Sequence, residues 1–158
     1  EAARIEETLL QIVPFAGFPR AIAAFGAARP HLGPHVPPAE PMPPCATGPE
    51  TFEAVYGKSA DPIRQELGTR HPDLLAWIQA FAYGRVLARP VLSLLERELL
   101  AVSILTALGS LEGPLLGHMR ACVRLGATPV DVAAAVTAVP HVLGEVHRDT
   151  ARSLLARL

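Results

Sequence analysis

Aromatic residues are scarce in this chain of 158 residues: they make up only 5% of it, although 50% of the residues are hydrophobic. Alanine, leucine and valine must therefore supply most of the core. Such a core favours closely packed helices over a sandwich or barrel, because strands are rich in aromatic and β-branched residues. No segment alternates convincingly between polar and apolar residues. We therefore expect an all-α fold.

Net charge is also lacking, since the formal charge is −1. The basic residues form no stripe, which argues against a nucleic-acid partner. The longest apolar run, residues 99–108, is broken by Ser103 and Thr106 and is too short to cross a bilayer. We expect neither nucleic-acid binding nor a membrane-spanning segment.

Cysteine is limited to Cys45 and Cys122, which lie too far apart for a paired redox motif. Because this is no disulfide framework, a reducing cytoplasm is the default compartment. The chain begins with Glu1 rather than methionine, so a leader peptide that had been removed would leave no trace.

Proline is unevenly distributed, and residues 30–49 hold eight of the sixteen prolines. Because proline at this density sustains neither a helix nor a ladder, we predict an extended linker there. The linker divides an arm, residues 1–29, from a main domain, residues 50–158. Pro14 and Gly17 break the arm into two predicted helices. A helix pair this small cannot bury its own apolar stripe, so the arm must dock on the main domain or on another chain.

Apolar spacing and helix breakers predict the helices of the main domain. Gly84 is expected to interrupt the helix that begins at Pro72, and Pro90 is expected to end it. The next helix is apolar nearly all round and should therefore be central. The predicted helices span residues 51–56, 61–67, 72–89, 94–108, 114–125 and 129–139, and a last amphipathic helix runs to the C-terminus.

Glu98 and His118 are the main candidates for chemistry. His118 shares an apolar helix face with Cys122, and an imidazole on such a face needs a polar partner. A short turn joins the two helices and predicts antiparallel packing, in which the two side chains need not meet. Base rates favour the simpler interpretation, a satisfied core histidine beside a solvated glutamate.

Three more side chains are candidates for substrate binding. Arg97 and Arg89 could hold the carboxylates of an anionic substrate, and Tyr83 could place a phenol beside a pocket. The competing interpretation places both arginines on the solvated surface and the tyrosine in the core.

Metal and thiol sites are less favoured. His141, Glu145 and Asp149 share a helix face, but we interpret it as a charged solvent face and expect no metal. Cys122 is interpreted as a small buried hydrophobe, and Cys45 as an exposed thiol without a neighbouring base.

Several segments between residues 51 and 145 resemble the carboxymuconolactone decarboxylase family. In chain order they read YGRVLARPVLSL (83–94), RELLAV (97–102), LTALG (105–109), HMRA (118–121) and GATPVD (126–131). The resemblance implies a helical fold of the alkylhydroperoxidase D type, assembled as trimers or hexamers. Members include decarboxylases of γ-carboxymuconolactone, from protocatechuate breakdown, that use no cofactor. Relatives of the alkylhydroperoxidase D type instead reduce their partners through a CxxC pair.

The chain also departs from the family pattern. No CxxC pair precedes His118, the turn before His118 is one residue longer, and Tyr83 stands where tryptophan is usual. The late aromatic-x-Gly-x-Pro motif is missing after Val139, but residues 9–21 of the arm resemble it. We therefore interpret the arm as the end of a first family repeat.

The resemblance leads us to expect a decarboxylase-like enzyme for a small anionic lactone or related carboxylate. His118 would donate the proton, and Glu98 would orient the imidazole of His118 and favour its protonated form. Arg97, with Arg89, would hold a carboxylate, and Tyr83 would donate to the oxyanion. Two alternatives stay open: a peroxidase-like relative that uses Cys122 or Cys45, and a non-catalytic oligomer with a degenerate pocket.

Overall fold

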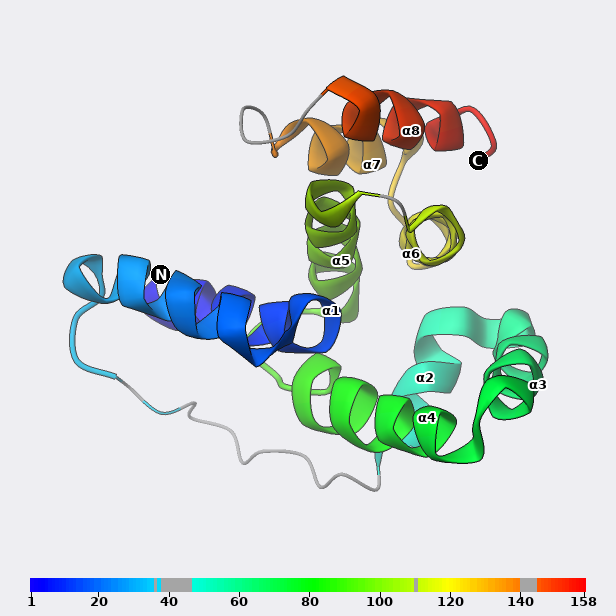
Figure 1. Cartoon of the computed structure of the whole chain (residues 1–158), viewed down its shortest axis with the longest axis horizontal. Coiled ribbons are helices and arrows are strands. Elements are labelled where there is room, and N and C mark those ends of the chain that lie inside the picture. The colour runs from blue at the N-terminus through cyan, green and yellow to red at the C-terminus, as the bar shows by residue number, and fades with distance from the viewer. Residues whose placement is uncertain (36, 38–46, 110, 140–144) are drawn as a thin grey trace. The chain divides into compact units, whose positions relative to one another are not determined.

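The computed structural model describes residues 1–35, 37, 47–109, 111–139 and 145–158, and within these ranges every regular element is helical (Figure 1). The predicted all-α fold is confirmed. The α-helices are α1 (Ala2–Ala28), α2 (Gly48–Tyr56), α3 (Ala60–Arg70), α4 (Pro72–Trp77), α5 (Leu94–Leu108), α6 (Glu112–Arg124), α7 (Pro129–Thr137) and α8 (Glu145–Leu155). Short 3₁₀ turns lie at Arg29–His31 and Gly57–Ser59, and a π-helical segment, η4, spans Ile78–Leu87.

The chain forms two compact units, Glu1–Leu92 and Ser93–Leu158. We call them the N-terminal and C-terminal units and describe each by itself. The predicted division into arm, linker and main domain remains a prediction, and half of the predicted linker lies outside the described residues.

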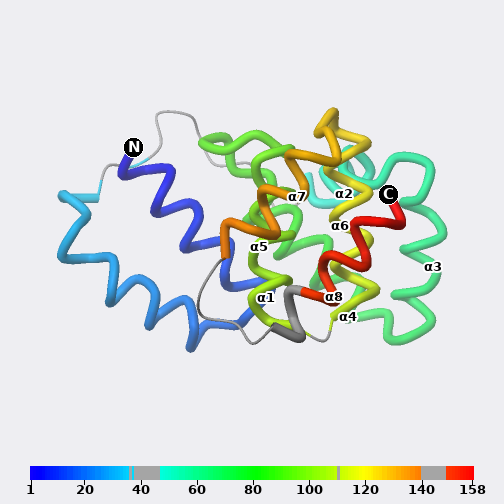
Figure 2. The backbone as a smooth tube through the Cα atoms, turned by 90° about the horizontal axis from the view of Figure 1, so that it is seen from above, coloured from blue at the N-terminus to red at the C-terminus, as the bar shows by residue number. Residues whose placement is uncertain are grey.

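Helix α1 consists of two helices that meet at Gly17, as the sequence predicts. Gly17 has φ 81° and ψ 165°, a left-handed conformation that interrupts the helix. Glu6, in the first half, accepts a hydrogen bond from Arg29 and lies 2.7 Å from Nδ1 of His35. These contacts hold the two halves side by side, as the tube in Figure 2 shows.

The apolar segment that bears on membrane crossing is α1, and not the run at residues 99–108 that the sequence suggests. The helical segment Ala2–His31 is long and apolar enough to cross a membrane by length and composition alone. However, the break at Gly17 leaves each half shorter than the about 20 residues that a span needs. The prediction that the chain does not span a membrane stays a prediction.

The core of the N-terminal unit lies where α2 packs against η4. Gly48 opens α2 so close to η4 that a Cβ atom there would lie 1.9 Å from the carbonyl oxygen of Gln79. Gly84 does not interrupt the helix as expected. The chain continues through it in π-helical geometry, with Gly84 buried beside this close approach. The buried apolar side chains of this interface are Phe52, Val55, Tyr83, Val86 and Leu87.

The C-terminal unit is built around α5, which packs against α6, α7 and α8. This confirms its predicted central position. Ser93 and Glu96 form a reciprocal capping box at its start, which explains why the helix begins at the expected residue. Thr128 and Asp131 form the same motif at α7. Fully or almost fully buried apolar residues fill the interior: Ala101, Val102, Met119, Val132, Val136 and Leu154.

Candidate functional site

Glu98 and His118 meet inside the C-terminal unit. Nδ1 of His118 lies 2.6 Å from Oε2 of Glu98, which is hydrogen-bond distance. Glu98 is fully buried and His118 is almost fully buried. The simpler interpretation, in which the glutamate is solvated and separate from the histidine, is wrong.

The crossing of the two helices explains why the side chains meet. Helix α6 is seen end-on in Figure 1 while α5 is seen along its length, so the helices cross rather than run antiparallel as predicted. Helix α6 begins at Glu112, two residues before the predicted start at Pro114. A crossing brings the middle of α6 over one point of α5, and the buried pair marks that point.

Glu98 is only half satisfied by this contact. Its Oε2 atom faces His118, whereas Oε1 is buried and has no hydrogen-bond partner among the described residues. A buried carboxylate oxygen without a donor is costly, so it marks a place where a ligand or a water molecule would be stabilised. The hydroxyl of Thr106, also on α5, is likewise buried and has no hydrogen-bond partner among the described residues.

Cys122 lies one turn after His118 on α6 and is fully buried, as expected. Burial raises the pKa of its thiol from the ordinary 9.0 to about 12, and the negative charge of Glu98 adds to the rise. The thiol is therefore protonated near neutral pH and has weak nucleophilic character. Cys45 lies outside the described residues.

Arg97 is fully buried on α5, so the interpretation of a solvated surface arginine is wrong for this residue. It directly precedes Glu98, but its predicted contact with a substrate carboxylate remains a prediction.

Tyr83 and Arg89 belong to the N-terminal unit and are both engaged there. The phenol of Tyr83 donates a hydrogen bond of 2.7 Å to the hydroxyl of Tyr56. Arg89 binds both carboxylate oxygens of Glu7 through Nε, at 2.7 and 2.8 Å. Its Nη2 atom adds a contact of 2.5 Å. The carboxylate that Arg89 holds in this structure is thus one from the arm, and its predicted substrate contact remains a prediction.

Sequence reasoning missed two of these partners. Glu7 is one of the acidic residues at the start of an otherwise apolar helix. An acid at the edge of an apolar stripe was the available signal that this residue has a buried basic partner. Tyr56 lies 27 residues before Tyr83, and nothing in the sequence marks the two as a pair.

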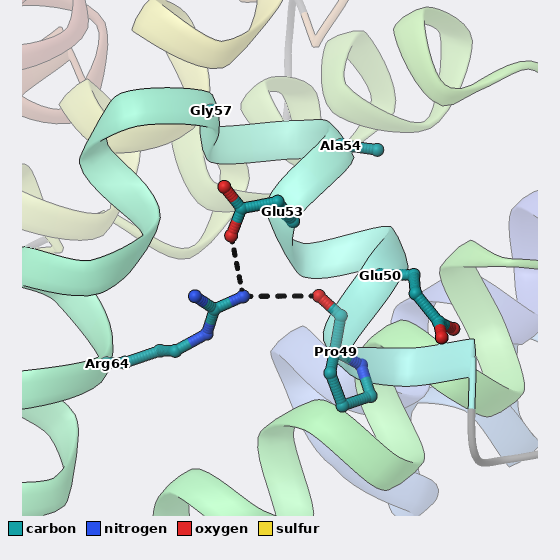
Figure 3. A pocket seen from close by; sticks show the side chains of 6 residues that line it. All are labelled: Pro49, Glu50, Glu53, Ala54, Gly57 and Arg64. Carbon is teal, nitrogen blue, oxygen red and sulfur yellow. Dashed lines mark hydrogen bonds and ion pairs between the residues drawn. The ribbon is translucent and has the colours of Figure 1, made fainter.

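A hollow of about 600 Å³ lies elsewhere in the N-terminal unit, lined by residues of α2 and Arg64 of α3 (Figure 3). It is open to solvent. Arg64 binds Glu53, Asp61 and the carbonyl oxygen of Pro49, and its guanidinium lies over the ring of Phe52. Through these contacts the charge of Arg64 holds α2 and α3 together. We therefore assign a structural role to the residues that line this hollow.

The predicted charged face of the last helix is only partly visible. His141 lies outside the described residues, and the side chain of Glu145 is not described. Over the ranges that the structure covers, no three histidine, cysteine, aspartate or glutamate side chains form a group that could hold a metal ion.

Comparison with known proteins agrees with the resemblance seen in the sequence. Residues 72–146 match the model of the carboxymuconolactone decarboxylase family, and the match includes both Glu98 and His118. No curated protein and no solved structure gives a significant match to the chain.

Proposed function

Residues 72–146 belong to the carboxymuconolactone decarboxylase family, and on this premise we propose that the chain is a decarboxylase of a small anionic lactone or a related carboxylate. The buried pair of His118 and Glu98, 2.6 Å apart, is the observation that carries the proposal. It joins a proton-exchanging group to a fixed carboxylate in a nearly dry setting, which is an arrangement suited to general acid catalysis.

The chemistry requires little from the protein. The bond between the carboxylate carbon and the lactone ring breaks, and its electron pair moves into the conjugated carbonyl to give an enolate. Carbon dioxide leaves, and one proton is then added to the ring carbon. Because the carbonyl of the substrate holds the electrons, we expect that neither a metal nor an organic cofactor takes part.

His118 supplies that proton in the proposed reaction. In the imidazolium form, Nδ1–H donates to Glu98, so the proton that is transferred is the one on Nε2. The carboxylate of Glu98 fixes the ring orientation and stabilises the imidazolium before the transfer. The unpartnered Oε1 of Glu98 is suited to accept a hydrogen bond from a substrate or from an ordered water molecule.

The other predicted site residues have weaker support. Arg97 is buried next to Glu98 and would hold a substrate carboxylate. Arg89 is occupied by Glu7, so the proposed mechanism does not depend on it. Tyr83 belongs to the N-terminal unit and its phenol donates to Tyr56 in this structure, so the proposed mechanism does not depend on it either.

Two alternatives have less support. A peroxidase-like reaction needs a thiolate, and the pKa of Cys122, raised by burial to about 12, keeps this thiol protonated at pH 7. A non-catalytic oligomer would give no reason for Oε1 of Glu98 to be buried without a hydrogen-bond partner among the described residues. We further propose that the protein acts in the cytoplasm as a homo-oligomer, without a nucleic-acid or membrane partner.

The test is release of carbon dioxide from γ-carboxymuconolactone by the wild type, His118→Ala and His31→Ala. His31 is an exposed histidine of the N-terminal unit and serves as the matched control. We expect His118→Ala to lower kcat by about 10²–10⁴-fold and His31→Ala to leave it unchanged. Equal turnover by all three proteins would contradict the role of His118, and no turnover by the wild type would contradict the lactone as substrate.

A further inference from the structure

The segment η4 has an unusual backbone geometry, because it is π-helical over ten residues, Ile78–Leu87. In a π-helix each amide donates to the carbonyl five residues back, one residue farther than in an α-helix. The hydrogen bond of 2.9 Å from the amide of Ala88 to the carbonyl oxygen of Tyr83 has this spacing. Most π-helices are single turns inside α-helices, often at functional sites, so the neighbours of this longer segment must favour its register.

The first such neighbour is α2, which begins directly against the backbone of η4. A Cβ atom at Gly48 would lie 1.9 Å from the carbonyl oxygen of Gln79 and 3.3 Å from the amide nitrogen of Gly84. Gln79 and Gly84 are five residues apart, which is the spacing of an acceptor and its donor in a π-helix. At the other end of α2, the hydroxyl of Tyr56 accepts a hydrogen bond from Tyr83. Helix α2 therefore contacts η4 where the π register is defined.

The second neighbour is the arm, which is attached just beyond the end of η4. Arg89 follows the segment by two residues and donates through Nε to both carboxylate oxygens of Glu7. The amide of Arg89 donates to the carbonyl oxygen of Val86 at 3.3 Å, so the position of this arginine depends on the last turn of η4. The side chains of Arg89 and Glu7 are only 18% and 3% exposed, which leaves the pair little room to follow a rotated helix end.

We propose that η4 is an element with two registers that couples the position of α2 to the docking of the arm. In the π register it holds α2 through Tyr83 and the arm through Arg89. If the amide of Ala88 donated to Gly84 instead, with α-helical spacing, the residues that follow would turn by about 100° around the helix axis relative to Tyr83. Arg89 would then point away from Glu7. The arm is therefore held in the π register and released in the α register.

The close contact at Gly48 makes the position of α2 the input of this device. Packed helices adopt discrete arrangements, so a small shift at one contact is converted into a change of register rather than a gradual deformation. The backbone of η4 leaves no room for an added atom at Gly48, so a methyl group there must push α2 and η4 apart. Coupling between two sites is reciprocal and typically changes an equilibrium about 5–150-fold. Release of the arm must therefore also loosen α2.

The register can be read by NMR in the deuterated full chain, from the scalar coupling that passes across a hydrogen bond. In the wild type, the amide nitrogen of Ala88 should couple to the carbonyl carbon of Tyr83. Gly48→Ala should move this coupling to the carbonyl of Gly84. It should also accelerate solvent exchange of the Nε proton of Arg89 by at least about fivefold, because the arm is released.

The matched control is Gly26→Ala, at a helical glycine of α1 where an added Cβ has no atom within 4 Å. It should change neither the coupling nor the exchange of the Arg89 proton. Tyr56→Phe serves if Gly48→Ala folds poorly, since it removes one hydroxyl of α2 without a backbone clash and should accelerate the same exchange. Glu7→Ala tests the reverse direction and should accelerate amide exchange within α2 by the same mechanism.

Three results would overturn the proposal. One is a wild type in which Ala88 couples to Gly84, and another is an unchanged exchange of the Arg89 proton in both α2 variants, which would make η4 a fixed scaffold. The third is an effect of Gly26→Ala as large as that of Gly48→Ala. None of these readouts involves turnover, so they can fail while the proposed reaction stands.

Discussion

Each unit contains a glutamate paired with a nitrogen base, but the two pairs differ in how far the carboxylate is satisfied. In the N-terminal unit, both oxygens of Glu7 accept hydrogen bonds from Arg89. In the C-terminal unit, Glu98 has one oxygen on His118 and one without a partner among the described residues. Both carboxylates are buried, so burial alone does not separate a structural pair from a chemical one.

The difference teaches where to look for function in such a fold. A saturated pair holds two segments together and offers nothing to a ligand, and here it fixes the arm to the end of η4. A half-satisfied pair has a hydrogen-bonding capacity that the described residues do not fill. Arginine keeps its protons, whereas an imidazole has one nitrogen that can give up or accept a proton, so the second pair is the one suited to proton transfer.

The largest stability effect should come from breaking the saturated pair. We expect Glu7→Ala to cost about 3 kcal/mol of unfolding free energy, because it leaves the mostly buried guanidinium of Arg89 without its carboxylate. Urea denaturation measures this cost. The control is Glu66→Ala, which breaks an exposed pair with Arg70 and should cost no more than about 0.5 kcal/mol. Equal effects of the two variants would mean that the arm is not held by a buried ion pair.

The second prediction uses the thiol of Cys122 as a sensor of the charge on Glu98. Burial and then Glu98 raise the pKa of this thiol to about 12, so Glu98→Gln should lower it, but not to its ordinary 9.0, because burial remains. Thiolate absorbance in a Cys45→Ser background measures the shift. An unchanged titration would show that Glu98 carries no negative charge near Cys122.

The same raised pKa predicts how stability depends on pH. Above pH 9.0 the unfolded thiol loses its proton while the folded thiol keeps it up to about pH 12. The unfolded state then binds fewer protons, so the free energy of unfolding should fall as the pH rises through this window. Denaturation of Cys122→Ala, in the same Cys45→Ser background, should show less of this fall.

A smaller effect on stability is expected at Thr106. Its hydroxyl is buried and unpartnered among the described residues, as is Oε1 of Glu98, but we expect that it does not serve a ligand. Thr106→Val removes the buried, unpartnered hydroxyl and keeps the shape, so we expect stability to stay the same or to rise by up to about 1 kcal/mol. Turnover should not change. A loss of more than about 1 kcal/mol would show that the hydroxyl has a bound water partner.

An effect of similar size is predicted at the start of α7. Thr128→Ala removes the side-chain cap and should cost about 1 kcal/mol, measured by urea denaturation. The hydrogen bond from the Thr128 hydroxyl also lowers the pKa of Asp131, so the contribution of this cap should weaken as the pH falls towards and below about 4. A loss independent of pH would contradict the reciprocal cap.

The sequence predicts those parts of the fold that depend on neighbours along the chain. Helix α5 begins and ends at the predicted residues, because a capping box and Gly109 lie next to it. The break at Gly17 is local for the same reason. The prediction for Gly84 was wrong because a glycine in a helix is usually a local weak point. Here Gly84 lies where Gly48 of α2 approaches η4 closely, and this contact depends on a neighbour in space that the local pattern does not reveal.

The candidate site shows the same limit. Polarity on an apolar helix face marked Glu98 and His118, but the crossing of α5 and α6, which decides that they meet, cannot be seen in the spacing. The pair of Glu7 and Arg89 lies 82 residues apart, and no local pattern links the two. Burial of Arg97 was missed because arginine is seldom fully buried.

The most direct test of the central claim compares Glu98→Gln with Glu7→Gln in decarboxylation of the lactone, each corrected for its folded fraction. Both substitutions keep the shape of the side chain and remove one buried negative charge. The account predicts that Glu98→Gln lowers kcat by at least about 100-fold, whereas Glu7→Gln changes it by less than about twofold. Equal losses, or a Glu98→Gln variant with the kcat of the wild type, would contradict the claim that the half-satisfied pair carries the chemistry.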